Sequence, residues 1–168
     1  MQSVKTLRAS VGRDFRHIFW SWLGGAVAIC LLGALTGYSS LPLLMAPFGA
    51  SCVLVFGLPE SPLAQPRNVI GGHTLTALTG FVFLFLFGDS WWAMGLAVGT
   101  AIAMMQLTRT IHPPAGANPV LVMMSAPAVT FLLFPVLSGA ALLVLIGLLM
   151  NNLSLTRSYP HKKGEQHV

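Results

Sequence analysis

The chain carries few charged side chains. Of its 168 residues, only 8% are Asp, Glu, Lys or Arg, whereas 55% are hydrophobic. Soluble globular domains have roughly 25% charged residues. The composition therefore excludes a soluble domain and predicts an integral membrane protein with several spanning segments. Between residues 18 and 156 the formal charges are limited to Glu60, Arg67, Asp89 and Arg109.

Carboxylates are especially scarce. We expect no Asp or Glu deep inside an apolar segment, and coordinated cation transport usually needs such groups, although backbone carbonyls can replace them. This scarcity favours a small anion or a neutral polar solute over a metal cation. The sequence also lacks paired carboxylates and a nucleophile triad, so we expect neither an enzyme nor a cofactor.

Cysteine is nearly absent. The two cysteines, Cys30 and Cys52, both fall within apolar segments. We interpret them as small buried hydrophobic residues, because free cysteine usually behaves in that way. Cysteines and histidines with the spacing of a zinc site are also lacking, and we therefore predict no metal centre.

The positive charge gathers at the two ends of the chain, although the net charge is only +5. By the positive-inside rule both ends are predicted to be cytoplasmic, and we expect a bacterial inner membrane as the location. Nothing folds these basic residues into an element that reads a nucleic-acid groove, so we expect no nucleic-acid partner. We divide the chain into a basic segment (1–17), two membrane regions (18–87 and 91–150) and a basic tail (151–168).

Six apolar segments can be marked along the chain. The second and the fifth are too short to cross a bilayer as regular helices, which takes about 20 residues, and both carry prolines near their starts. If all six segments cross, Arg67 and Arg109 lie on the cytoplasmic side with the basic ends; if the two short segments were re-entrant loops, both arginines would lie outside. The six-crossing arrangement is therefore favoured. The segments are 18–38, 41–58, 68–87, 91–107, 114–125 and 131–149.

The two short segments are similar to one another. A shift of 67 residues places residues 47–55 on residues 114–122, and six of the nine positions are then identical. Three crossings in each repeat force the two halves into opposite orientations. We therefore predict an all-α membrane protein with six transmembrane segments, formed by two inverted three-segment repeats that each contain one broken helix. The same shift aligns two pairs of glycines, Gly72 with Gly139 and Gly80 with Gly147.

Each broken segment is predicted to enter the membrane as extended chain and to become helical near the midplane. The second helix would start near Phe48, and the fifth near Gly116 or Ala117. The two helix N-termini would then face each other and expose unpaired N–H groups, which attract an anion without a buried cation. The alternative is a pair of tightly packed kinks that satisfy their own backbone. The candidate substrate-binding residues are Pro47, Gly49, Ala50, Ser51, His112, Pro113, Pro114, Gly116, Ala117 and Asn118.

Two histidines are the candidate titratable groups. His112 lies at the cytoplasmic entrance of the fifth segment, and His73 lies about two turns into the third, with Thr76 on roughly the same face. Because lipid disfavours such a polar stripe, we expect it to point inward, with the two histidines near each other. Histidine titrates near neutral pH, so we predict gating or proton coupling by these three residues; the alternative is a capping or packing role. Arg109 is either a cytoplasmic-mouth attractant or a topology anchor.

The stretch HPPAGANP at residues 112–119 resembles the motif for which the HPP family of integral membrane proteins is named. The resemblance covers most of the membrane region. Chloroplast and cyanobacterial members of that family are linked to nitrite transport, so the resemblance implies a similar activity here. The family is usually described with fewer spans than six. Our count is higher because it separates the two short broken helices.

The residues and the resemblance agree on a transporter or channel for a small monovalent anion. The resemblance implies nitrite, whereas the residues alone leave nitrate, formate and chloride open. A neutral small-solute channel is the first alternative, and a membrane partner or sensor without transport is the second. We expect a homo-oligomer, because a chain this small can barely enclose a pore alone.

Overall fold

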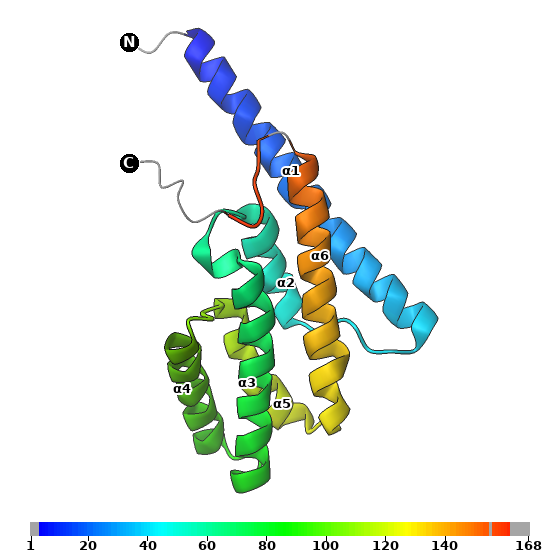
Figure 1. Cartoon of the computed structure of the whole chain (residues 1–168), viewed down its shortest axis with the longest axis vertical. Coiled ribbons are helices and arrows are strands. Elements are labelled where there is room, and N and C mark those ends of the chain that lie inside the picture. Colours follow the sequence, from blue (N-terminus) through cyan, green and yellow to red (C-terminus); the bar gives the residue numbers. More distant parts are fainter. Residues whose placement is uncertain (1–3, 155, 162–168) are drawn as a thin grey trace.

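The computed structural model describes the backbone of residues 4–154 and 156–161, and side chains from Phe15 onward. Every regular element in this part of the chain is helical (Figure 1). Six α-helices are joined by short turns and extended segments. They are α1 (Val4–Ser39), α2 (Pro47–Cys52), α3 (Pro66–Phe87), α4 (Trp91–Thr108), α5 (Asn118–Ser125) and α6 (Ser138–Leu153).

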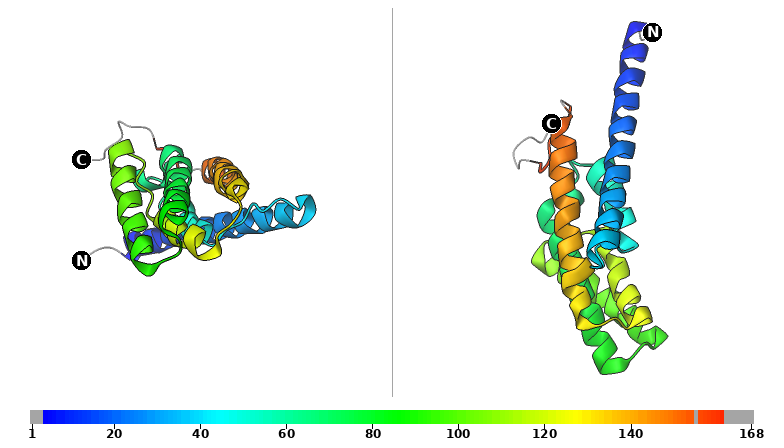
Figure 2. Two further views of the ribbon diagram at one scale, coloured as in Figure 1. Left: turned by 90° about the horizontal axis from the view of Figure 1, so that it is seen from below. Right: turned by 90° about the vertical axis from the view of Figure 1, so that its right-hand side faces the viewer.

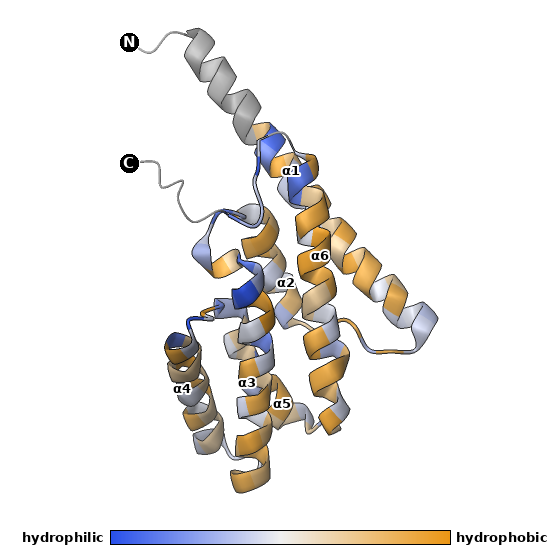
Figure 3. Cartoon of the chain, viewed as in Figure 1, coloured by the Kyte–Doolittle hydropathy of each residue, from blue (hydrophilic) through white to orange (hydrophobic). Residues whose placement is uncertain are grey.

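Four stretches of the chain are long and apolar enough to cross a membrane, namely Phe15–Ser39, Pro66–Phe87, Trp91–Thr108 and Val129–Leu153. Large apolar side chains lie on the outside of these helices; Phe85, for example, is 88% exposed. Figure 3 shows hydrophobic residues along most of the length of α3, α4 and α6. Such a surface suits contact with lipid, and the protein is an integral membrane protein with four candidate spans.

The first helix is longer than the apolar segment predicted for it. It begins at Val4 rather than near Ile18, so most of the predicted basic N-terminal segment continues the same helix. Figure 2 shows this part of α1 projecting beyond the other helices. Residues 1–3 and 162–168, which belong to the two predicted basic ends, lie outside the described residues.

The two short helices start close to the predicted breaks. Helix α2 begins at Pro47, one residue before the predicted start, and a π-helical turn, η1 (Val53–Gly57), continues it. A 3-10 turn, η3 (Pro113–Ala117), precedes α5, so the regular helix begins at Asn118 instead of at Gly116 or Ala117. The two helices run toward opposite ends of the molecule (Figure 1).

The sixth segment contains a break that the sequence analysis did not predict. It starts with a 3-10 turn, η4 (Val129–Leu132), and a π-helical turn, η5 (Leu133–Leu137), before α6 begins. Phe134, next to Pro135, has extended backbone angles (φ −132°, ψ 113°). A residue before proline avoids the α-helical region for steric reasons, which explains why the regular helix starts only at Ser138.

Glycines on α3 and α6 allow the broken segments to approach closely. A Cβ atom placed on Gly72 would lie 3.0 Å from the Thr110 carbonyl oxygen, and one on Gly139 would lie 2.5 Å from that of Leu43. Neither position has room for a side chain, because real Cβ contacts are longer. Further along the same helices, the corresponding contacts are Gly80 with Val122 at 3.1 Å and Gly147 with Val55 at 2.7 Å.

The C-terminal segment folds back onto the end of the molecule where α1 begins. Tyr159 is only 1% exposed, and its hydroxyl donates to the Ala64 carbonyl over 2.8 Å. Burial raises the pKa of this phenol, which keeps it protonated as a donor. Arg157 donates to the Phe56 carbonyl over 3.0 Å and to Ser21 Oγ over 2.8 Å, so the segment ties the end of η1 to α1.

Candidate functional site

Five polar side chains of the membrane region gather in one buried cluster. Its residues belong to α2, α3 and α5 and to the position just before η3, and each of them is 0% exposed. Polar groups in the interior of a membrane protein are costly unless they are hydrogen-bonded, and they usually mark functional sites. We call this the histidine cluster; its members are Ser51, His73, Thr76, His112 and Asn118.

Ser51 bridges the two histidines. Its Oγ lies 2.8 Å from Nε2 of His73 and 2.8 Å from Nε2 of His112. The centroids of the two imidazole rings are 5.0 Å apart, with the planes inclined at 67°. The prediction that His73 and His112 lie near each other is therefore confirmed. Because Ser51 belongs to α2 and His112 immediately precedes η3, the two broken segments meet at this bridge.

His73 is held from both sides of its ring. Ser51 contacts Nε2, and the Asn118 amide nitrogen lies 3.0 Å from Nδ1. The same nitrogen donates to the His73 carbonyl and to Thr76 Oγ1, both over 3.0 Å. Phe48 covers the ring edge-on, with centroids 5.1 Å apart. His73 is therefore fixed in one orientation.

The proton positions in the cluster follow from its two ends. At one end, His112 Nδ1 lies 2.8 Å from the Leu63 carbonyl, which can only accept, so Nδ1 carries the hydrogen. Nε2 of a neutral His112 must then accept the Ser51 hydroxyl hydrogen. Ser51 has no other hydrogen, so it accepts from Nε2–H of His73, whose Nδ1 accepts from Asn118.

The other end leads to the same assignment. The Asn118 atom next to the His73 carbonyl must be the NH2 group, because two acceptors would repel each other. The same nitrogen lies 3.0 Å from Nδ1 of His73, so its two hydrogens are shared among three acceptors. Because Nδ1 faces a donor, it carries no hydrogen. Two neutral histidines thus complete a single directed chain of hydrogen bonds from Asn118 to Leu63, and no charged group takes part in it.

One buried polar atom of the cluster has no partner. Asn118 Oδ1 is buried and accepts no hydrogen bond within the part of the chain that the structure describes. Leaving such an acceptor unsatisfied costs about 1–3 kcal/mol. Exchanging the oxygen and nitrogen of the amide would not help, since the nitrogen would lose its bonds to His73 and Thr76. The cluster can therefore accept one further hydrogen bond from a donor at Asn118.

Several predicted site residues lie outside the cluster. Gly49 and Gly116 were predicted to bind substrate, but a Cβ atom on either would meet nothing within 4 Å. Both therefore point away from the packed interior, unlike Gly72. The predicted residues that are exposed on the surface are Gly49, Ala50, Pro113 and Ala117, while Pro47 is buried and Pro114 and Gly116 are half-buried.

Arg109 is exposed and ends α4 in the left-handed conformation, with φ 56°. Nearby, Arg67 donates to the Thr108 carbonyl over 2.8 Å, so the two arginines lie at the same end of the bundle. This agrees with the predicted placement of both on one side. No hydrogen bond described for the cluster involves Arg109, and its role at the mouth stays a prediction.

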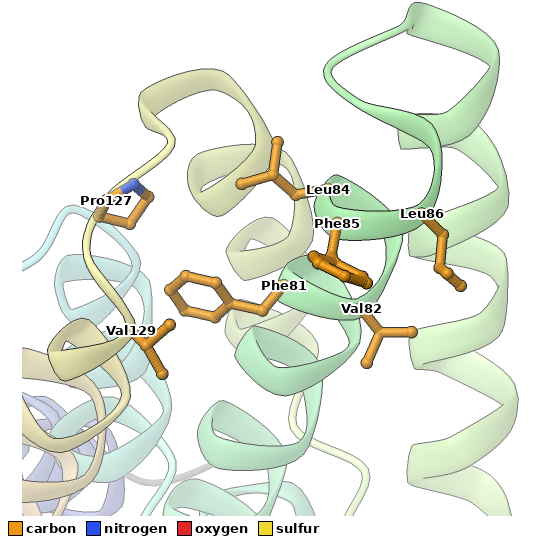
Figure 4. Close-up of a pocket in the computed structure, with 7 residues that line it drawn as sticks. All are labelled: Phe81, Val82, Leu84, Phe85, Leu86, Pro127 and Val129. Atoms are coloured by element: carbon orange, nitrogen blue, oxygen red, sulfur yellow. The ribbon is translucent and has the colours of Figure 1, made fainter.

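A groove of about 500 Å³ lies between the end of α3 and the segment after α5 (Figure 4). It does not include any residue of the histidine cluster. An anion transferred from water would find no hydrogen-bond donor on such side chains, so this groove does not suit a small polar substrate. Its lining residues are all apolar: Phe81, Val82, Leu84, Phe85, Leu86, Pro127 and Val129.

Sequence reasoning missed two parts of the site. The Leu63 carbonyl fixes His112, and Phe48 closes one side of His73. A main-chain acceptor in a short turn leaves no sequence signal of its own. Phe48 did stand in the repeat, but its partner there is Ala115, so the alignment gave no reason to choose it.

Comparison with known proteins identifies relatives along nearly the whole chain. The model of the HPP transmembrane region matches residues 11–160. Two transmembrane proteins of Dictyostelium discoideum are similar as well: one is 38% identical over 88% of this chain and 56% of its own length, the other 36% identical over 91% and 53%. The chain thus spans about half the length of these relatives. No solved structure matches it.

Proposed function

Because the chain belongs to the HPP transmembrane family, we propose that it carries a small monovalent anion across the membrane and binds it at the histidine cluster. The observation that carries this proposal is the pair of fully buried histidines bridged by Ser51, at the point where two broken segments meet. Polar groups are retained at such depth in a membrane protein when they serve a substrate or proton path. The resemblance to nitrite-transporting family members favours nitrite as the anion.

The local chemistry supports an anion over a cation. The cluster contains no carboxylate, and its imidazole rings become cationic when they take up a proton. A neutral histidine can also donate an N–H to an oxygen of the substrate. The five side chains are closed to the outside in this conformation, so we propose that α2 or η3 moves to admit the anion.

Pairs of equivalent contacts support the inverted-repeat arrangement that we propose for the fold. Gly72 of the first half contacts Thr110 of the second, and Gly139 of the second half contacts Leu43 of the first. Each pair is related by the 67-residue shift, since 72 + 67 = 139 and 43 + 67 = 110. The contacts of Gly80 and Gly147 repeat in the same way. A two-fold relation between the halves accounts for both sets.

Within this arrangement the two halves differ in chemistry. The counterparts of His73 and His112 under the 67-residue shift are Ala140 and Met45, both buried and apolar. Ser51 and Asn118, in contrast, are counterparts of each other and bind opposite nitrogens of His73. We propose that the symmetric scaffold provides the path, and that the titratable function belongs to one side of it.

The test of this proposal is nitrite uptake into liposomes that contain the purified protein. Nitrous acid itself crosses lipid, so protein-free liposomes at the same pH set the baseline, and formate serves as a second anion. We expect His73→Ala and His112→Ala each to lower the protein-dependent rate about tenfold or more, the loss that about 1.4 kcal/mol produces. His161→Ala is the matched control, because that histidine lies outside the cluster. Uptake of neither anion above the baseline would overturn the proposal.

A second candidate function is favoured by Asn118 Oδ1. This unpaired acceptor suits a neutral solute that brings its own N–H or O–H donor, whereas an anion such as nitrite cannot satisfy it. Stopped-flow light scattering of the same liposomes with urea or formamide tests this alternative. Rapid permeation of these solutes that Asn118→Leu abolishes, without any anion uptake, would favour the neutral-solute channel.

We further propose that the start of α1 and the end of α6 face the cytoplasm and that the protein works as a homo-oligomer. Both of these helix ends lie at the same end of the molecule (Figure 1), which supports a common side for them. The basic residues near both ends of the chain favour the cytoplasmic side.

A further inference from the structure

We infer that His112 is the histidine that takes up a proton, that the Ser51 hydroxyl turns to Pro47 when it does so, and that this proton crosses together with the anion. The inference rests on the proposed function and deepens it, because it assigns a coupling ion and a carrier. It is carried by the hydrogen-bond geometry around Ser51, whose single hydrogen has two alternative acceptors.

The first acceptor is Nε2 of His112 at 2.8 Å, and the second is the Pro47 carbonyl at 3.3 Å. When His112 is neutral, Nε2 accepts the hydroxyl hydrogen. When a proton binds to Nε2, the new N–H points at Ser51 Oγ, and the hydroxyl hydrogen rotates to the Pro47 carbonyl. Ser51 Oγ then accepts from both histidines, which its two lone pairs allow. No bond is broken, and no heavy atom has to move.

His73 has no such alternative. Its free ring nitrogen is Nδ1, which already accepts from the Asn118 NH2 group over 3.0 Å. A proton on Nδ1 would place two donors against each other. Rotating the Asn118 amide would relieve this but would bring its oxygen against the His73 carbonyl, 3.0 Å away. The surroundings therefore hold His73 neutral and leave His112 as the proton carrier.

The charge on a protonated His112 has no built-in partner. Both hydrogen-bond partners of its ring, Ser51 and the Leu63 carbonyl, are uncharged. A buried unpaired charge is strongly unfavourable. A monoanion bound beside the ring removes this penalty, so the proton and the anion favour each other's binding.

The titratable and charged groups on the surrounding elements are His73 and Arg67 on α3, Cys52 on α2, Glu60 before the turn that holds Leu63, and Arg109 after α4.

These surrounding groups do not provide a charged partner for His112. Glu60, Arg67 and Arg109 are exposed at the surface, whereas His112 is 0% exposed. Cys52 is a buried thiol without charge.

Transport of one proton with one monoanion is electroneutral. We therefore expect the flux to follow the proton gradient and not to depend on the membrane potential. The flux should rise as the pH on the side of the anion falls.

The decisive experiment measures both species in the same liposomes. A pH-sensitive dye is enclosed, nitrite is added outside, and the internal proton gain is compared with the nitrite gain. We expect a ratio near one, with no effect of a potassium–valinomycin potential. Nitrite uptake without internal acidification, or uptake driven by the potential, overturns the inference while it leaves the proposed function intact.

A matched pair of variants tests which histidine carries the proton. The Nε2 group of glutamine can replace the donor that His73 offers to Ser51, so His73→Gln should keep the proton-to-nitrite ratio near one, at a lower rate. His112→Gln should abolish the dependence on the proton gradient. The opposite pattern overturns the inference. Melting temperatures in detergent verify that both variants are folded.

Nitrogen-15 NMR of histidine-labelled wild-type protein gives a readout that does not depend on transport or on variant folding. As the pH falls, we expect the imidazolium signature to appear at His112 while His73 keeps its Nε2–H tautomer. A protonated His73 beside a neutral His112 overturns the inference. If no nitrite is transported but His112 still takes the proton, the anion proposal and the coupled crossing both fail, and only the assignment of His112 as the protonated histidine remains.

Discussion

At the scale of single residues, Asn118 determines the directions of the hydrogen bonds around it. Its amide group determines which nitrogen of His73 carries a hydrogen, and through Ser51 this choice reaches His112. Among the described residues, its oxygen finds no hydrogen-bond partner. The directions of the hydrogen bonds in the cluster therefore depend on an uncharged side chain as well as on the two titratable ones.

Replacing Asn118 with aspartate should move the proton to His73. The substituted carboxylate cannot donate to Nδ1, so that nitrogen has to carry a hydrogen instead, and the resulting ion pair is buried. We expect nitrite uptake to fall about tenfold or more, which corresponds to about 1.4 kcal/mol, because the negative charge opposes the anion. NMR of labelled histidines should show the imidazolium at His73. Unchanged uptake would contradict the assigned orientation of the amide.

At the level of the helices, the close approach of α3 to the segment before η3 determines where His112 lies. A Cβ atom on Gly72 would lie 2.8 Å from that of His112. Gly72→Ala should therefore displace His112, destabilise the protein by about 1–3 kcal/mol through overpacking, and lower uptake. Gly49→Ala is the matched control, because nothing lies within 4 Å of the added atom. Thermal unfolding in detergent and nitrite uptake measure the two effects; equal loss in both variants would contradict the prediction.

The C-terminal segment also holds two helical elements together. Arg157 donates to the Phe56 carbonyl and to Ser21 Oγ, and so joins the end of η1 to α1. Arg157→Ala removes both of these donated hydrogen bonds, although the Phe56 carbonyl keeps the one from the Ser21 hydroxyl. The substitution should lower the melting temperature, by an amount that corresponds to about 1–3 kcal/mol. Arg157→Lys should recover little of this, since an ammonium group lacks the planar fork. Full recovery by lysine would contradict the role of the fork.

The sequence predicted the short helices well because proline leaves a local signal. Pro47 marks the start of α2 to within one residue of the prediction, and the inward face of α3 followed from the spacing of His73 and Thr76. The break at Phe134 was missed, although Pro135 was visible, because the run around it is uniformly apolar. The contacts that orient His112 were unpredictable, since they come from a main-chain carbonyl 49 residues away.

At the level of the whole molecule, two membrane topologies differ in the side on which Arg67 and Arg109 lie. Arg67 donates to the carbonyl of Thr108, the residue before Arg109, whereas Asp89 lies after the far end of α3. If the short segments cross as extended chain followed by helix, both arginines share the side on which α1 begins, in agreement with the positive-inside rule. If the short segments return to the side they came from, the arginines share the other side. The opposite directions of α2 and α5 favour the first arrangement, which we therefore predict (Figure 1).

Labelling with a membrane-impermeant thiol reagent tests this topology in oriented membrane vesicles. We expect Arg109→Cys to react only in inside-out vesicles and Asp89→Cys only in right-side-out vesicles, because the two positions are exposed at opposite ends of α4. Cys30, which the sequence analysis interpreted as buried, is exposed, so the background variant Cys30→Ser removes its thiol. Cys52 is buried, as expected, and serves as an internal negative control. Reaction of both positions from one side would contradict the crossing of α4. Reversed accessibility would place the start of α1 and the end of α6 outside the cell. A proton that enters through His112 would then come from the opposite compartment.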